Sequence, residues 1–220
     1  MRLEKEKKTG WYITDKVDSL SKEDYLQIRQ AKTLHETVLE HVFEAYLIGL
    51  LYLPNKSPFS VSYDKQKILN IIMIHDIGEA YTGDYPPFYV DYKKKKEEES
   101  NCCERILLSG IHNKSADLLE YFQMWLDWYN WCDQSISGEY NITVARDIDQ
   151  LQMLYKLLTL LGNKTIELSK TRFDNFWRAV DTLRSQEAKE IFNIIIADEP
   201  TFCEVVKNYG VKLCKFVVKI

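Results

Sequence analysis

The sequence has little that would cross-link it, interrupt it often or anchor it in a membrane. It contains only five prolines and eight glycines in 220 residues, and its five cysteines follow no regular spacing: Cys102, Cys103, Cys132, Cys203 and Cys214. An odd, irregular set excludes a disulfide framework and is typical of reduced thiols. The longest apolar run, residues 46–53, is far shorter than the roughly 20 residues of a membrane helix. Residues 1–11 lack the apolar stretch of a signal peptide, so we expect a cytoplasmic protein with no membrane partner.

The sequence also has no excess of positive charge. Its 29 lysines and arginines face 33 aspartates and glutamates, for a net charge of −4. Because proteins that bind DNA or RNA usually carry a basic face, we expect no nucleic-acid partner. A hydrophobic content of 45% over 220 residues is enough for one sizeable core. The sequence therefore predicts a single domain over residues 1–220.

Strand patterns are scarce, and apolar residues recur mostly at helical spacing. Breaks fall at 54–58, at 78–89, at 135–141 and at Gly162-Asn163. The prediction is an all-α, single-domain helical bundle. The expected helices cover residues 36–53, 63–77, 93–108, 120–131, 144–161, 173–184 and 186–196, and the segment after Pro200 packs back on the domain.

Two of these helices have conspicuous compositions. Four lysines, 93–96, precede three glutamates, 97–99, and this run is interpreted as a solvated helix face. The stretch from Tyr121 to Trp131 is rich in aromatic residues. Core packing is the favoured interpretation of that stretch, and contact with a second copy of the chain is the alternative.

Histidine and aspartate carry the clearest chemical signal. His75 is followed directly by Asp76 at the end of the most apolar helix, where an ionisable pair is costly unless its charge is compensated. A divalent metal supplies that compensation. His41 near the start of another helix, and Asp147 and Asp149 at the start of a third, are weak signals alone, since aspartates also favour helix N-termini. Together they indicate a metal site.

These stretches resemble the HD-domain phosphohydrolases, most closely the branch with the bacterial 5′-deoxynucleotidases. The resemblance rests on residues 36–41, 74–87, 104–107 and 145–153, and the motif core spans about 36–162. The segment His-Asp-x-x-Glu-x-x-x-Gly-Asp at 75–84 is much more specific than a bare His-Asp pair.

The resemblance implies a role for several residues. His41, His75, Asp76 and Asp149 match the metal ligands. Asp149 is preferred to Asp147 because it precedes the stretch 150–153 that matches the family's last motif. Glu79 matches the residue that activates water, and Asp84 matches a catalytic-site residue near the substrate sugar and phosphate. The loop that continues this substrate contact contains Tyr85, Pro86 and Pro87.

The sequence departs from the family pattern near its start. Where the family tends to have an arginine close to a tryptophan, this chain has Lys8 and Trp11, and residues 14–25 resemble an insertion. Lys8 can neutralise a phosphate without the two-pronged contact of arginine. Core packing is the alternative for Trp11, and Arg29 and Lys32 are alternative phosphate partners.

The resemblance implies metal-dependent removal of phosphate from (deoxy)nucleoside 5′-monophosphates by an activated water. The ligand types leave Mn²⁺, Co²⁺, Fe²⁺, Zn²⁺ and Mg²⁺ open. Three alternatives remain: an HD hydrolase of a triphosphate or signalling nucleotide, an HD module that binds nucleotide without turnover, and a purely structural helical protein. A homodimer is the expected assembly.

Overall fold

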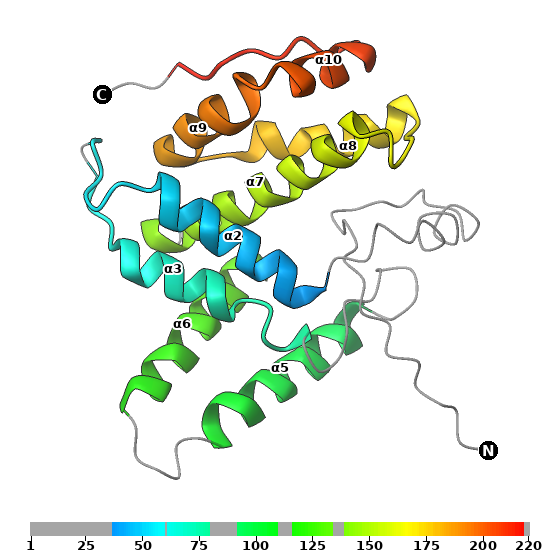
Figure 1. Ribbon diagram of the computed structural model, residues 1–220. Helices are drawn as coiled ribbons and strands as arrows, with labels where there is room; N and C mark the ends of the chain where they lie inside the picture. The colour runs from blue at the N-terminus through cyan, green and yellow to red at the C-terminus, as the bar shows by residue number, and fades with distance from the viewer. Residues whose placement is uncertain (1–36, 60, 80–91, 110–115, 134–138, 218–220) are drawn as a thin grey trace, which may run out of the picture. The chain divides into compact units, whose positions relative to one another are not determined.

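The computed structural model describes residues 37–59, 61–79, 92–109, 116–133 and 139–217, and every regular element in these ranges is a helix (Figure 1). The prediction of an all-α fold is thereby confirmed. The helices are α2 (Val38–Tyr52), α3 (Lys65–Ile74), α5 (Tyr92–Ser109), α6 (Ala116–Asp133), α7 (Tyr140–Gly162), α8 (Lys170–Thr182), α9 (Gln186–Phe192), the π-helix η2 (Asn193–Ala197) and α10 (Pro200–Asn208).

The chain forms two compact units that alternate along the sequence. One unit comprises residues 1–41 and 76–122, and the other comprises residues 42–75 and 123–220. Helices α2 and α6 each contain a boundary between the units, and a third boundary falls between His75 and Asp76. A single domain over the whole chain stays a prediction.

Helix α7 is the central element of the second unit. In Figure 1 it lies between α3 on one side and α8 to α10 on the other, and it packs against α3, α8, α9 and α10. Its buried residues point in several directions, as expected for a helix that is covered by neighbours. Val144, Ile148, Leu151, Leu154 and Leu158 are all completely buried.

A glycine allows α2 to approach α3 and α7 closely. A Cβ atom at Gly49 would lie 3.0 Å from Leu69 Cδ2 and 3.6 Å from Ile148 Cδ1. Gly49 itself is buried, and Leu69 and Ile148 are core residues. The missing side chain therefore makes room for the two apolar side chains that α2 covers.

The structure corrects several of the helix boundaries expected from the sequence. Helix α7 begins at Tyr140 and not at Val144, so Asp147 and Asp149 lie well inside the helix and away from its N-terminus. The expected helix over 186–196 changes to a π-helix at Asn193. Pro200 begins helix α10, where a proline is well tolerated because the first helical N–H has no partner to lose.

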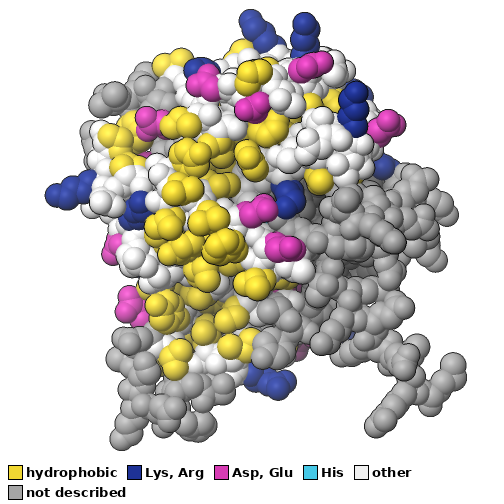
Figure 2. Space-filling view, in the orientation of Figure 1, with side chains coloured by type: hydrophobic (Ala, Val, Ile, Leu, Met, Phe, Trp, Pro, Cys, Tyr) yellow, Lys and Arg dark blue, Asp and Glu magenta, His cyan; other side chains and the backbone are white. Residues whose placement is uncertain are grey.

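The aromatic stretch in α6 agrees with the core-packing interpretation. Met124, Trp125 and Trp128 are buried within the unit that contains them. A different surface carries exposed apolar side chains: Figure 2 shows them gathered in a band over α2, which includes Phe43, Leu50, Leu51 and Tyr52.

The described cysteine side chains agree with the prediction of free thiols. Cys102, Cys103, Cys203 and Cys214 form no disulfide. Burial, with a smaller contribution from Cys102, raises the pKa of the Cys103 thiol to about 12, which keeps that thiol protonated and unreactive. In the described part of the chain, no helix is both long and apolar enough to cross a membrane.

Candidate metal centre

His75 and Asp149 lie next to each other because α3 and α7 pack side by side with matched N-termini. Asp64 N–H donates to Asn141 Oδ1 over 2.8 Å, and Lys67 Nζ donates to both carboxylate oxygens of Glu139. His75 lies eight residues after Lys67, and Asp149 lies eight residues after Asn141. The distance from His75 Nε2 to Asp149 Oδ1 is 3.5 Å.

The ring of His75 is held in one orientation. Its Nδ1 lies 2.7 Å from the carbonyl oxygen of Ile72, and a carbonyl can only accept a hydrogen bond, so Nδ1 carries the proton and donates it. The other ring nitrogen, Nε2, then holds the lone pair that a metal needs. Trp128 packs edge-on against the same ring, with 4.9 Å between the ring centroids.

His41 and Asp76 form a second pair of the same kind. The Thr37 N–H donates to Glu40 Oε2 and the Glu40 N–H donates to Thr37 Oγ1, a capping box that fixes where α2 begins. His41 follows directly in the first turn of the helix and is 3% exposed. Its Nε2 lies 3.5 Å from Asp76 Oδ2.

The donor set and the spacing within each pair fit a divalent ion. A separation of 3.5 Å is longer than a good hydrogen bond. Two ligand atoms that share one ion at about 2.1 Å, with angles of about 90–110°, lie roughly 3.0–3.4 Å apart. Both pairs are therefore close to the spacing of metal ligands. Among the described residues, His41, His75 and Asp76 are a group that could hold a metal ion.

Asp147 has different surroundings from Asp149, although it is only two residues away. Its Oδ2 accepts hydrogen bonds from the Arg184 N–H (2.9 Å), the Ser185 N–H (2.6 Å) and the Ser185 Oγ–H (2.8 Å). Ser185 in turn caps α9. Burial raises the pKa of Asp147 even though these hydrogen bonds lower it. Asp147 thus anchors the turn between α8 and α9, whereas Asp149 faces His75.

Glu79, the expected base, lies in the first unit beside helix α5. Its Oε1 is 2.9 Å from Lys95 Nζ, and the same ammonium is 3.1 Å from Glu99 Oε1. Burial raises the pKa of Glu99, and the neighbouring Lys95 opposes that rise. The contact of Lys95 with Glu79 differs from the solvated helix face that the sequence predicts for the run 93–96.

A second glycine brings α5 close to the segment that carries Glu79. A Cβ atom at Gly78 would lie only 2.7 Å from the backbone oxygen of Glu99. Any other residue at position 78 would therefore push the two backbones apart. The close contact of the two backbones thus explains why a glycine stands between Asp76 and Glu79.

The remaining expected site residues lie outside the described residues. They are the substrate-side residues Asp84, Tyr85, Pro86 and Pro87, the phosphate partners Lys8 and Trp11, and the alternatives Arg29 and Lys32. Their roles stay predictions.

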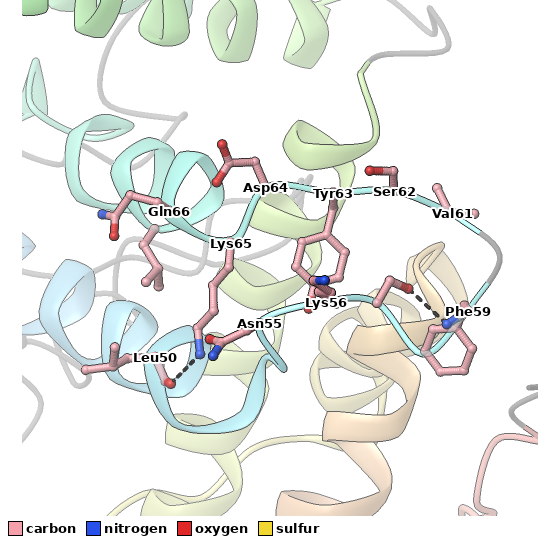
Figure 3. Close-up of a pocket in the computed structure, with 12 residues that line it drawn as sticks. Leu50, Asn55, Lys56, Phe59, Val61, Ser62, Tyr63, Asp64, Lys65 and Gln66 are labelled. Atoms are coloured by element: carbon pink, nitrogen blue, oxygen red, sulfur yellow. Dashed lines mark hydrogen bonds between the residues drawn. The ribbon is translucent and has the colours of Figure 1, made fainter.

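A hollow of about 900 Å³ lies at the opposite end of α3 from His75. Figure 3 shows the residues around it, with Lys65 at the start of α3 donating to the carbonyl oxygen of Leu50. Lys65 also donates to the carbonyl oxygen of Leu53. At 1.5 Å per residue, the ten residues from Lys65 to His75 span about 15 Å. The hollow is therefore separate from the contact between His75 and Asp149.

Comparison with protein families matches residues 26–192 to the HD domain. The all-helical fold, the consecutive His75 and Asp76 and this match together define a metal-dependent phosphohydrolase. The chain belongs to the HD domain family, as the resemblance predicted.

Two curated relatives are similar to this chain at low identity. The 5′-deoxynucleotidase YGK1 of Saccharomyces cerevisiae is 22% identical over 179 residues, which cover 79% of this chain and 74% of the relative. The 5′-deoxynucleotidase HDDC2 of Dictyostelium discoideum is 25% identical over 158 residues, which cover 70% of this chain and 69% of the relative. No solved structure matches the chain.

Proposed function

We propose that the chain removes phosphate from deoxynucleoside or nucleoside 5′-monophosphates, using one divalent ion bound by His41, His75, Asp76 and Asp149. The proposal rests on two contacts of 3.5 Å, one between His41 and Asp76 and one between His75 and Asp149. His75 and Asp76 are consecutive, so a single peptide bond links the two pairs. The two relatives named 5′-deoxynucleotidases support this choice of substrate.

The chain's own residues supply orientation and proton transfer. When bound, the divalent ion polarises the phosphoryl group and lowers the pKa of water. Glu79 accepts a proton from the attacking water as its oxygen bonds to phosphorus. The bond from phosphorus to the 5′ oxygen breaks, and the proton is returned to that departing oxygen. The products are a nucleoside and inorganic phosphate.

Substrate contact is proposed for residues on both sides of this centre in the sequence. Asp84 would accept hydrogen bonds from the sugar, with Tyr85, Pro86 and Pro87 forming the rest of the contact loop. Lys8 and Trp11 would neutralise and cover the phosphate. We also propose that the protein acts in the cytoplasm as a homodimer, which light scattering of the purified protein would test.

A phosphate-release assay tests the proposal. Purified protein is stripped with EDTA, and Mn²⁺, Co²⁺, Fe²⁺, Zn²⁺ or Mg²⁺ is added back with a panel of nucleoside mono-, di- and triphosphates and cyclic nucleotides. We expect turnover of 5′-monophosphates that needs metal. Glu79→Gln should reduce it at least about 100-fold, whereas the exposed Glu98→Gln should not change it.

Two results would contradict the proposal. If the protein turns over only triphosphates or signalling nucleotides, one of these is its substrate class in place of the 5′-monophosphates. Nucleotide binding without phosphate release under any metal would instead indicate a binding module.

A further inference from the structure

Lys95 differs from its neighbour Lys94. Its side chain is 12% exposed, whereas that of the adjacent Lys94 is 68% exposed. Lys94 contacts Glu98, one helical turn away, over 4.0 Å. Lys95 instead contacts carboxylates from two separate segments of the first unit, which a solvated helix face does not require.

Lys95 and Glu99 together fix the carboxylate of Glu79, and this arrangement is called the clamp on Glu79. Its Nζ lies 2.9 Å from Glu79 Oε1 and 3.1 Å from Glu99 Oε1. Glu99 is four residues after Lys95 on α5, so it holds the ammonium against its own helix. Glu79 belongs to the segment that approaches α5 at Gly78. The three side chains are mostly buried, which strengthens a charged contact relative to one in water.

We propose that Lys95 is a positioning residue, which holds Glu79 oriented to accept the proton of the attacking water. This inference rests on the proposed function. Lys95 engages Oε1 of the Glu79 carboxylate, the group that is proposed to take the proton. A carboxylate held by a charged hydrogen bond keeps one orientation, which lowers the cost of arranging the reacting groups.

The test compares Lys95→Met and Lys95→Arg with Lys94→Met, a control at the adjacent exposed lysine. Because Lys95 acts through Glu79, Lys95→Met should lower kcat by about 10–100-fold and leave KM within about twofold. Lys95→Arg should recover most of the loss, and Lys94→Met should match the wild type. If Lys95→Met does not fold, Lys95→Gln replaces it with the same expectations. A rise in KM with unchanged kcat would overturn the proposal and assign Lys95 to substrate binding.

A double substitution separates positioning from an independent role. In the Glu79→Gln background, Lys95→Met should cause little further loss of kcat, since the group that Lys95 holds has already been replaced. Losses that multiply would show that Lys95 acts without Glu79 and would overturn the proposal.

A stability measurement keeps the inference distinct from the proposed function. If the wild type releases phosphate from no nucleotide, the proposed function fails on its own. Thermal unfolding of the wild type, Glu79→Gln, Lys95→Met and the double variant then decides the contact. Non-additive shifts in Tm support a clamp on Glu79, and additive shifts overturn it.

Discussion

Asp147 and Asp149 are two residues apart on α7, yet their carboxylates serve different parts of the molecule. Asp147 is completely buried and accepts three hydrogen bonds from the turn at Arg184 and Ser185. Asp149 is partly exposed and lies 3.5 Å from the ring nitrogen of His75. The first carboxylate is placed to stabilise the fold, and the second is the proposed metal ligand.

This difference predicts opposite effects of the same substitution. Asp147→Ala leaves three donors, two of them buried, without their acceptor, which costs about 3 kcal/mol, or roughly 6–12 °C in Tm for a chain of this size. Asp149→Ala should leave the Tm of the metal-free protein within about 2 °C and abolish phosphate release. Calorimetry and the phosphate assay check both variants. An Asp149→Ala protein with normal turnover would refute the ligand assignment.

Replacement of Gly78 tests whether activity needs the close approach of α5 to the segment that carries Glu79. In Gly78→Ala the new Cβ would lie 2.7 Å from backbone oxygen, so the backbone must move, at a cost of about 1–3 kcal/mol. We expect a lower Tm and at least a tenfold loss of kcat, because Lys95 moves with α5. Gly49→Ala is the control, since its Cβ would meet only the ends of side chains, with Leu69 Cδ2 nearest at 3.0 Å, and no backbone atom. Equal effects of the two substitutions on kcat would contradict the account.

Trp128 should report on the state of His75. The two rings are 4.9 Å apart, so metal binding at His75 changes the electronic surroundings of the indole. Titration of stripped protein with metal should change the tryptophan fluorescence. Trp128→Phe should lose most of that change, and Trp177→Phe, whose indole stacks on Phe173, should keep it. A signal unaffected by Trp128→Phe would place the metal elsewhere.

The ion pair between Lys67 and Glu139 should make part of the stability depend on pH. The hydrogen bond from Lys67 holds the pKa of Glu139 below its ordinary value of 4.5, against the effect of burial. A lowered pKa in the folded state means that the contribution is complete above about pH 4.5 and is lost as the pH falls through the folded pKa. Glu139→Gln should therefore lower Tm at pH 6–7.

The same measurement at lower pH supplies the check. The difference in Tm between wild type and Glu139→Gln should shrink between pH 4.5 and pH 3, and Lys67→Met should follow the same course. A difference that stays constant with pH would show that the ion pair is not its cause.

Much of the helical fold could be predicted because its signals are local. The apolar spacing of α2 and α3 and the break at Gly162 gave boundaries within a few residues of the structure. The sequence predicts a later start for α7, at residue 144, because Tyr140 and Asn141 look like loop residues. Asn141 accepts a hydrogen bond from Asp64 on another segment, and no local pattern reveals such a contact.

In the candidate site, too, local features could be predicted from the sequence and contacts between distant segments could not. His75 and Asp76 stood out because a charged pair at the end of an apolar helix needs compensation. The contact of Lys95 with Glu79 could not be predicted, since four consecutive lysines look alike until the close approach at Gly78 selects one of them. The spacing of four residues between Lys95 and Glu99 is shared by Lys94 and Glu98, so it could not single out Lys95.

The metal content of the purified chain tests the central claim most directly. Wild type, Asp149→Ala and Asp147→Asn are loaded with Mn²⁺, dialysed and analysed by mass spectrometry for bound metal per chain. We predict about one ion per chain for the wild type and for Asp147→Asn, whose amide oxygen can still accept from Ser185, and a large loss for Asp149→Ala. Equal metal content in the wild type and Asp149→Ala would contradict a centre that includes His75 and Asp149.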